Sequence, residues 1–158
     1  MNGDVSHSLH PSSSPFGMRE VAAGRAATVV VRMAGDGNCL FRALAHPHGD
    51  HRVVRACVVR HMRERWHADY APFVDARERG TYLDAMAEDG TWGDELVLRA
   101  FARLARVPVR VHAAEPPHPL LSAYGEDGRA PSARRRAAAA AARALTYDGA
   151  HYDVLLTV

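Results

Sequence analysis

Two residues whose side chains suit nucleophilic catalysis, Cys39 and His151, stand far apart in the chain. Cys39 follows the turn-forming residues Asp36, Gly37 and Asn38, and good helix formers come after it. We therefore expect Asn38 to cap a helix and the Cys39 thiol to lie in its first turn. The positive end of a helix stabilises a thiolate, and free N–H groups of a glycine turn can bind the oxyanion formed when sulfur attacks a carbonyl. The pattern predicts a catalytic Cys39 and, in the three residues before it, an oxyanion loop.

His151 has the surroundings that a catalytic base requires. It begins a predicted strand, and Asp153 lies two positions further on. Because residues two apart in a strand point to the same side, the Asp153 carboxylate can accept a hydrogen bond from the imidazole nitrogen that faces away from the sulfur. We expect His151 to act as base and acid and Asp153 to fix its tautomer. Tyr152 points to the other side and is interpreted as a packing residue.

The other potentially reactive side chains have simpler interpretations. Cys57 shares an apolar stripe with Met62 and several valines, so it is predicted to be a small buried residue and not a partner for a disulfide with Cys39. Three histidines gather in residues 46–51. No cysteine or carboxylate pattern of metal-binding spacing accompanies them, so no metal site is predicted.

The hydrophobic periodicity predicts helices in the middle of the chain and strands towards both ends. The predicted elements are a buried strand over 27–33, helices over 39–45, 54–66 and 74–87, a helix after Asp94 with Val97, Phe101 and Leu104 on one face, strands over 107–111 and 120–124, and a hairpin of 145–147 and 151–158. Asp148 and Gly149 are expected to supply the positive backbone dihedrals of a tight hairpin turn. The order predicts an α+β fold whose two ends meet in one sheet.

The bulk properties fit a single domain. The chain has 158 residues, and no apolar run approaches the roughly 20 residues that a membrane-spanning helix needs. Residues 1–18 are polar and lack the pattern of a secretory signal, so we predict a flexible tail followed by one domain over 19–158. Two cysteines in unlike settings favour an intracellular, cytoplasmic location.

An Arg-rich segment, residues 129–143, suggests nucleic-acid binding as an alternative function. Within it, residues 132–142 fit either a helix or a surface loop. The formal net charge of the chain is only +2, which argues against a dedicated nucleic-acid binder.

Two motifs resemble those of a known family. Residues 36–44, Asp-Gly-Asn-Cys-Leu-Phe-Arg-Ala-Leu, resemble the cysteine box of the ovarian tumour (OTU) deubiquitinases, and His151-Tyr152-Asp153 resembles their histidine box. Between them, the family's middle segment is matched in the expected order by residues 82–83, 90–96 and 107–111. In its compact length the chain is similar to viral and bacterial-effector members of the family.

The resemblance implies a papain-like fold, with a small central sheet packed between helices, the cysteine at a helix N-terminus and the histidine on the C-terminal strand. It implies a monomer that hydrolyses isopeptide bonds of ubiquitin or polyubiquitin, or of a ubiquitin-like modifier, through a thioester and without metal or cofactor. For a viral or effector protein the location would be the host cytoplasm. A module of this fold that binds ubiquitin without cutting it is the alternative.

The resemblance also assigns residue roles. Cys39 matches the nucleophile, His151 the base and Asp153 the orienting acid. Asp36 matches a position often counted with the active site, and we expect it to shape the oxyanion loop without touching substrate. Substrate contacts are expected from Trp92, Asp94 and Glu95, although Trp92 could instead close the core and the two acids could instead favour the positive end of the following helix.

Overall fold

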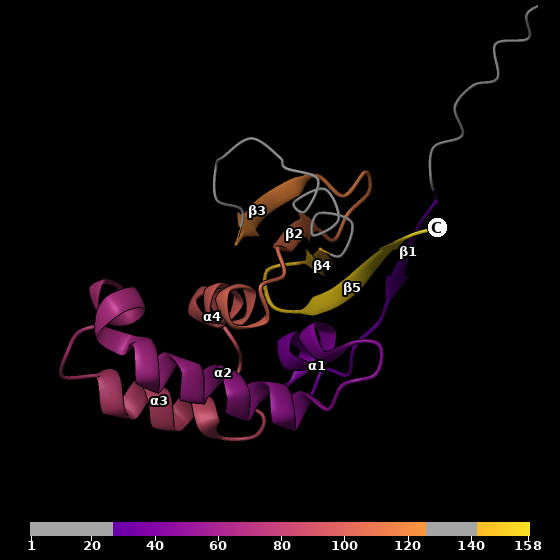
Figure 1. Cartoon of the computed structure of the whole chain (residues 1–158). Coiled ribbons are helices and arrows are strands. Elements are labelled where there is room, and N and C mark those ends of the chain that lie inside the picture. The colour runs from indigo at the N-terminus through magenta and orange to yellow at the C-terminus, as the bar shows by residue number, and fades with distance from the viewer. Residues whose placement is uncertain (1–26, 126–141) are drawn as a thin grey trace, which may run out of the picture.

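The computed structural model describes residues 27–125 and 142–158, which form a mixed α+β fold (Figure 1). The helices are α1 (Cys39–Ala45), α2 (His51–Arg65), the short η1 (Trp66–Tyr70) and η2 (Ala71–Phe73), α3 (Arg79–Ala87) and α4 (Glu95–Ala105). The strands are β1 (Thr28–Val31), β2 (Val109–Ala113), β3 (Leu120–Tyr124), β4 (Arg143–Tyr147) and β5 (Tyr152–Thr157). The expected order, helices between strands from both ends of the chain, is confirmed.

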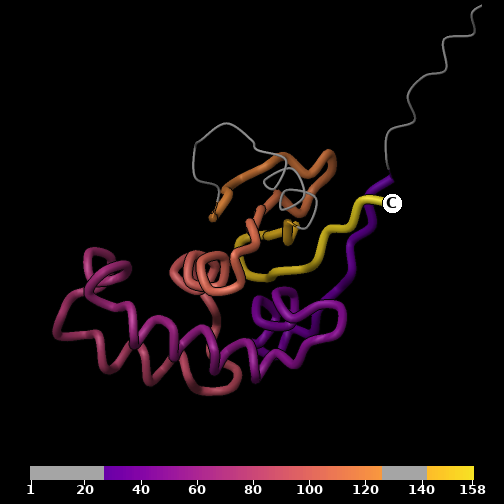
Figure 2. The backbone as a smooth tube through the Cα atoms, in the orientation of Figure 1, coloured from indigo at the N-terminus to yellow at the C-terminus, as the bar shows by residue number. Residues whose placement is uncertain are grey.

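The five strands form one sheet in the order β1-β5-β4-β2-β3. Only β2 and β4 pair in parallel, and the other neighbours are antiparallel. The trace in Figure 2 shows β1 running beside β5, the last strand, and the amide of Val158 donates to the carbonyl of Ala27 at 2.8 Å. The two ends of the described fold therefore meet in one sheet, as predicted.

The first strand is not buried, contrary to the prediction. β1 lies at the edge of the sheet, where it pairs only with β5, and Thr28 and Val29 are exposed. An edge strand lacks a neighbour on one side, so a β-branched sequence alone does not guarantee burial.

The apolar core lies between α1, α2, α4 and the sheet. α1 packs against both α2 and β5, and α4 packs against α2 and β3. The largest buried side chains include Phe41, Leu44, Val58, Met62, Trp66, Val97, Val109 and Leu145. The thiol-bearing helix is thus held between the helical layer and the last strand.

The predicted faces of two helices need correction. In α2 the buried side includes Arg55 and Val59, whereas Cys57 is only half-buried. In α4 Leu104 is 40% exposed, and the helix buries residues on more than one side because α2 and β3 both cover it. The periodicity therefore located these helices but not their full contact surfaces.

α3 is shorter than the helix predicted over 74–87. It begins at Arg79, and the preceding residues form a turn in which the Asp75 carboxylate accepts the Arg77 amide at 2.8 Å. Such a local side-chain hydrogen bond competes with helical bonding of the backbone.

The C-terminal hairpin is confirmed, but its turn differs from the prediction. β4 and β5 pair with Thr146 opposite Asp153, and residues 148–151 connect them. Gly149 has a positive φ of 104°, while Asp148 contributes through its carboxylate, which accepts the amides of Ala150 and His151. Asp148 therefore shapes the turn through its side chain.

Two predictions lie outside the described residues. These are the flexible tail over 1–18 and nearly all of the Arg-rich segment 129–143, together with its helix-or-loop alternative. Within the described ranges, no helix combines the length and apolar character needed to cross a bilayer.

Candidate active site

Cys39 is the first residue of α1 and is 8% exposed. It lines a cavity of about 540 Å³ that the loop before α4, the strand β3 and the hairpin also border. As predicted, the thiol lies in the first turn of a helix.

Asn38 occupies the N-cap position of α1, but its side chain does not cap the helix as we predicted. Its Oδ1 is turned away and accepts from Arg55 and from the amide of Gly90. The buried guanidinium of Arg55 competes successfully for this oxygen, because a charged donor forms the stronger hydrogen bond.

Asp36 is turned towards α1. Its carboxylate forms an ion pair with Arg42 and accepts the amide of Asn38 at 3.1 Å. The hydrogen bond from Arg42 is the main reason why the pKa of Asp36 lies well below its ordinary value. These contacts fix the shape of the loop before Cys39.

His151 and Asp153 form the hydrogen bond expected from their spacing. The distance from His151 Nε2 to Asp153 Oδ1 is 3.2 Å. Because a carboxylate only accepts, Nε2 carries the proton and Nδ1 of the neutral ring is left as the basic nitrogen. The backbone of His151 is also held, since its amide donates to Asp148 at 2.8 Å.

Asp153 is 3% exposed and is surrounded by donors. Besides His151, the amide of Met33 donates to Oδ1 and Arg32 Nη1 donates to Oδ2, both at 2.7 Å. Pairing of β1 with β5 brings these two residues into place. Their role could not be predicted from the sequence, because it depends on which strand lies beside β5.

The imidazole lies next to the loop that leads to Cys39. A Cβ atom placed on Gly35 would lie 4.0 Å from His151 Cε1. Ala150 and Tyr152, on either side of His151, line the same cavity as Cys39. The fold therefore brings the imidazole beside the loop that carries Cys39, and brings the residues flanking His151 to the cavity that Cys39 lines.

Trp92, Asp94 and Glu95 all line this cavity. Trp92 is 67% exposed, so the alternative that it closes the core is wrong. Asp94 caps α4 by accepting the amides of Leu96 and Val97, and Glu95 forms an ion pair with Arg99. The two acids thus favour the positive end of α4 and also border the cavity.

Several cavity residues were missed in the sequence. Tyr152 packs as predicted, because its ring stacks on that of Tyr147 with centroids 4.5 Å apart and burial raises the pKa of its hydroxyl. It also lines the cavity, which was not predicted. Other lining residues not anticipated are Val111, Leu121, Ser122, Tyr124 and Tyr147. They come from β2, β3 and β4, which only sheet pairing brings together.

Cys57 does not line this cavity, and within the described residues both cysteines are free thiols. Over 27–125 and 142–158, no group of three or more His, Cys, Asp or Glu side chains could hold a metal ion.

A thiol at the start of a helix and, beside the loop that leads to it, a histidine held by a carboxylate define the class of cysteine-type hydrolases. A family profile described as OTU-like cysteine protease matches residues 34–152. The chain therefore belongs to the OTU-like cysteine protease family.

Individual relatives and solved structures agree with this assignment. The chain is 37% identical over 87 residues to OVARIAN TUMOR DOMAIN-containing deubiquitinating enzyme 10 of Arabidopsis thaliana, covering 51% of this chain and 23% of that protein. It is 38% identical over 90 residues to OVARIAN TUMOR DOMAIN-containing deubiquitinating enzyme 11 of the same organism, covering 52% of this chain and 36% of that protein. The structure of the Hazara virus OTU bound to ubiquitin superposes with a TM-score of 0.63 at 23% identity, covering 83% of this chain and 82% of that one. The solved structure supports the fold, and the chain spans about a third or less of the length of these two curated relatives.

Proposed function

We propose that the protein is a cysteine-type deubiquitinase that hydrolyses the bond between the C-terminal carbonyl of ubiquitin and an amine. Cys39 is the nucleophile, His151 the base and acid, and Asp153 the orienting carboxylate. Two findings support ubiquitin as the substrate: the relatives are named deubiquitinating enzymes, and the similar Hazara virus OTU was solved bound to ubiquitin.

One observation carries the proposal. Cys39 lines the same cavity as the residues flanking His151, and His151 is held through Nε2 by a buried carboxylate. This hydrogen bond keeps the proton on the nitrogen bound to Asp153, so the other ring nitrogen can exchange a proton with the thiol.

The reaction follows from these groups. His151 takes the thiol proton, and the thiolate attacks the carbonyl carbon to form a tetrahedral oxyanion. Collapse of this intermediate breaks the C–N bond, and the imidazolium gives its proton to the leaving amine. Water, deprotonated by His151, then hydrolyses the thioester and regenerates the thiol.

The cavity fits an extended, mostly uncharged peptide end. Its walls carry Trp92, Leu121, Tyr124, Tyr147 and Tyr152, and Glu95 stands at its border. Aromatic side chains contact a flexible backbone at low entropic cost, and the acid can attract a basic residue of the incoming chain. Both cysteines are free, which suits the reducing, intracellular compartment that we propose for the protein.

A ubiquitin C-terminal amide reporter tests the proposal. Turnover should be lost in Cys39→Ala and retained in Cys57→Ala, because only the first thiol lines the cavity. Equal loss in both variants, or turnover in Cys39→Ala, would contradict it. Binding of ubiquitin without turnover by the parent protein would favour the non-cleaving alternative.

A further inference from the structure

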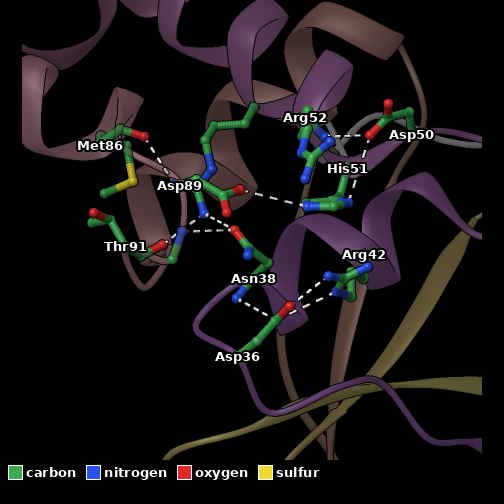
Figure 3. A network of polar contacts seen from close by, with 11 residues as sticks. Asp36, Asn38, Arg42, Asp50, His51, Arg52, Met86, Asp89 and Thr91 are labelled. Atoms are coloured by element: carbon green, nitrogen blue, oxygen red, sulfur yellow. Dashed lines mark hydrogen bonds and ion pairs between the residues drawn. The ribbon is translucent and has the colours of Figure 1, made fainter.

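A buried arginine joins the loop before Cys39 to the α3–α4 region, and Figure 3 labels the three residues that accept its hydrogen bonds, Asn38, Met86 and Thr91. Arg55 lies in α2 and is 3% exposed. Its Nη2 donates to Asn38 Oδ1 at 2.7 Å and to the carbonyl of Thr91 at 2.8 Å, while Nη1 donates to the carbonyl of Met86 at 2.9 Å. One guanidinium therefore bridges three separate segments of the chain.

The charge of Arg55 is buried against neutral oxygens. These three acceptors are carbonyl or amide groups, and the guanidinium also lies 3.8 Å from the centroid of the Phe41 ring. Burial lowers the pKa of Arg55, opposed by the charges of Asp89 and Asp36. An apolar side chain would fill this place with a smaller desolvation penalty, so the arginine is best explained by the specific arrangement that it imposes.

The same arrangement fixes the loop from a second side. Asn38 Oδ1 also accepts the amide of Gly90 at 3.0 Å. A Cβ atom on Gly37 would lie 1.8 Å from the carbonyl oxygen of Gly90, so the two backbones are in direct contact there. The α3–α4 loop thus supports the loop before Cys39, and Arg55 binds both.

We propose that Arg55 is a positioning residue for the reaction. Through Asn38 and Thr91 it holds the loop before Cys39 in the shape that lets backbone N–H groups bind the oxyanion. Among the described residues, none accepts a hydrogen bond from the Cys39 amide, which leaves this donor for the substrate. The inference rests on the proposed function, because attack on a carbonyl is what creates the oxyanion.

The test uses the full chain in a Cys57→Ala background. Arg55→Met removes the donors at similar length, and Arg55→Lys keeps the charge but cannot bridge all three acceptors. Arg63→Met is the matched control, because Arg63 also lies in α2 but its side chain donates to Asp84 of α3, at 2.8 Å, and not to Asn38 or Thr91. We expect kcat on the ubiquitin reporter to fall about tenfold to a hundredfold in Arg55→Met with little change in KM, as for a misplaced catalytic group. The loss should be smaller in Arg55→Lys and absent in Arg63→Met.

Two further readouts separate positioning from general damage. Iodoacetamide alkylates Cys39 by displacement at a saturated carbon, which forms no oxyanion, so its rate should stay near that of the parent in Arg55→Met. Amide hydrogen exchange in residues 36–41 should become faster in Arg55→Met and stay unchanged in Arg63→Met.

The outcomes are distinct. An Arg55→Met protein with the kcat and the loop exchange of the parent would overturn the inference, and so would an alkylation rate that falls in proportion to kcat. A parent protein that does not turn over the reporter, while Arg55→Met still loosens the loop, would refute the proposed function and leave the loop-holding role of Arg55 standing.

Discussion

The Asp153 carboxylate serves three donors that come from different places in the chain. Oδ1 accepts from His151 and from the Met33 amide, and Oδ2 accepts from Arg32. Arg32 is the exposed member of this group, with 77% of its side chain accessible. Oδ1 is therefore the oxygen on which the orientation of His151 depends.

This asymmetry predicts different effects for two substitutions of Asp153. Asn keeps an oxygen in the Oδ1 position, and its amide nitrogen would face the exposed Arg32 side chain. Ala leaves both His151 and the Met33 amide without an acceptor. We expect kcat/KM on the ubiquitin reporter to fall about tenfold in Asp153→Asn and about a hundredfold or more in Asp153→Ala. Equal losses in the two variants would show that the charge, and not the acceptor, is what His151 needs.

The ion pair of Asp36 with Arg42 predicts a pH dependence of stability. The pKa of Asp36 is lowered in the folded protein, chiefly by the hydrogen bond from Arg42, from an ordinary value of 3.8. A lowered folded-state pKa means that the contribution is complete above the ordinary value and is lost as the pH falls below it. Between pH 5 and pH 2, the Tm of the protein should therefore fall more than that of Asp36→Asn. Parallel Tm curves would contradict this account of Asp36.

At the scale of elements, the contact between the loop before Cys39 and the α3–α4 loop sets the shape of the site. Gly37 has a φ of 82° and lies against the carbonyl of Gly90. Position 37 therefore requires glycine both for its backbone conformation and for lack of space for a Cβ atom. No side chain can be added there without separating the two loops.

A matched pair of glycine substitutions tests this contact. Gly37→Ala should lower the free energy of unfolding by more than about 1 kcal/mol and abolish most turnover, because both the φ and the space are unsuitable. Gly80 lies in α3 with nothing within 4 Å of its missing Cβ. Gly80→Ala should raise the free energy of unfolding by about 0.5–1 kcal/mol and leave turnover unchanged. Urea unfolding measures both, and similar effects of the two substitutions would rule out the contact.

Much of this element structure could be predicted from the sequence, because local signals specify it. Residues 39–45 form the predicted helix, and the strand 120–124 and the hairpin are where alternation and turn residues indicated them. The failures have non-local causes. Asn38 does not cap α1 because a guanidinium from α2 takes its oxygen, and β1 is exposed because it is an edge strand.

For the whole molecule, sheet order is what assembles the candidate site. β5 lies between β1 and β4, so Asp153 has a neighbouring strand on both sides, and α1 packs against the same strand. His151 precedes β5 and is held by Asp148 of the hairpin turn and by Asp153. The pairing of His151 with Asp153 could be predicted from their two-residue spacing, although β5 begins at Tyr152 and His151 lies just before it instead of starting the strand. The contributions of Arg32, Met33 and the aromatic walls could not, since they depend on which strands become neighbours.

Because helices and sheet share one core, we expect a single unfolding transition. Leu145 in β4 is fully buried, and Leu145→Ala should lower the free energy of unfolding by about 2–5 kcal/mol. Leu156 in β5 is 38% exposed, so Leu156→Ala should have a clearly smaller effect. Urea unfolding followed by circular dichroism and by tryptophan fluorescence should give coincident curves. Separate transitions would show that the helical layer and the sheet are independent units.

The proposed function requires that folding brings the Cys39 thiol close enough to the His151–Asp153 pair to be activated for attack on the C-terminal carbonyl of ubiquitin. Trapping with ubiquitin bearing a thiol-reactive electrophile at its C-terminus, followed by peptide mass spectrometry, tests this most directly. We predict one adduct, located on Cys39, that forms much more slowly in His151→Ala. An adduct on Cys57, or labelling of Cys39 that is indifferent to His151, would contradict the account.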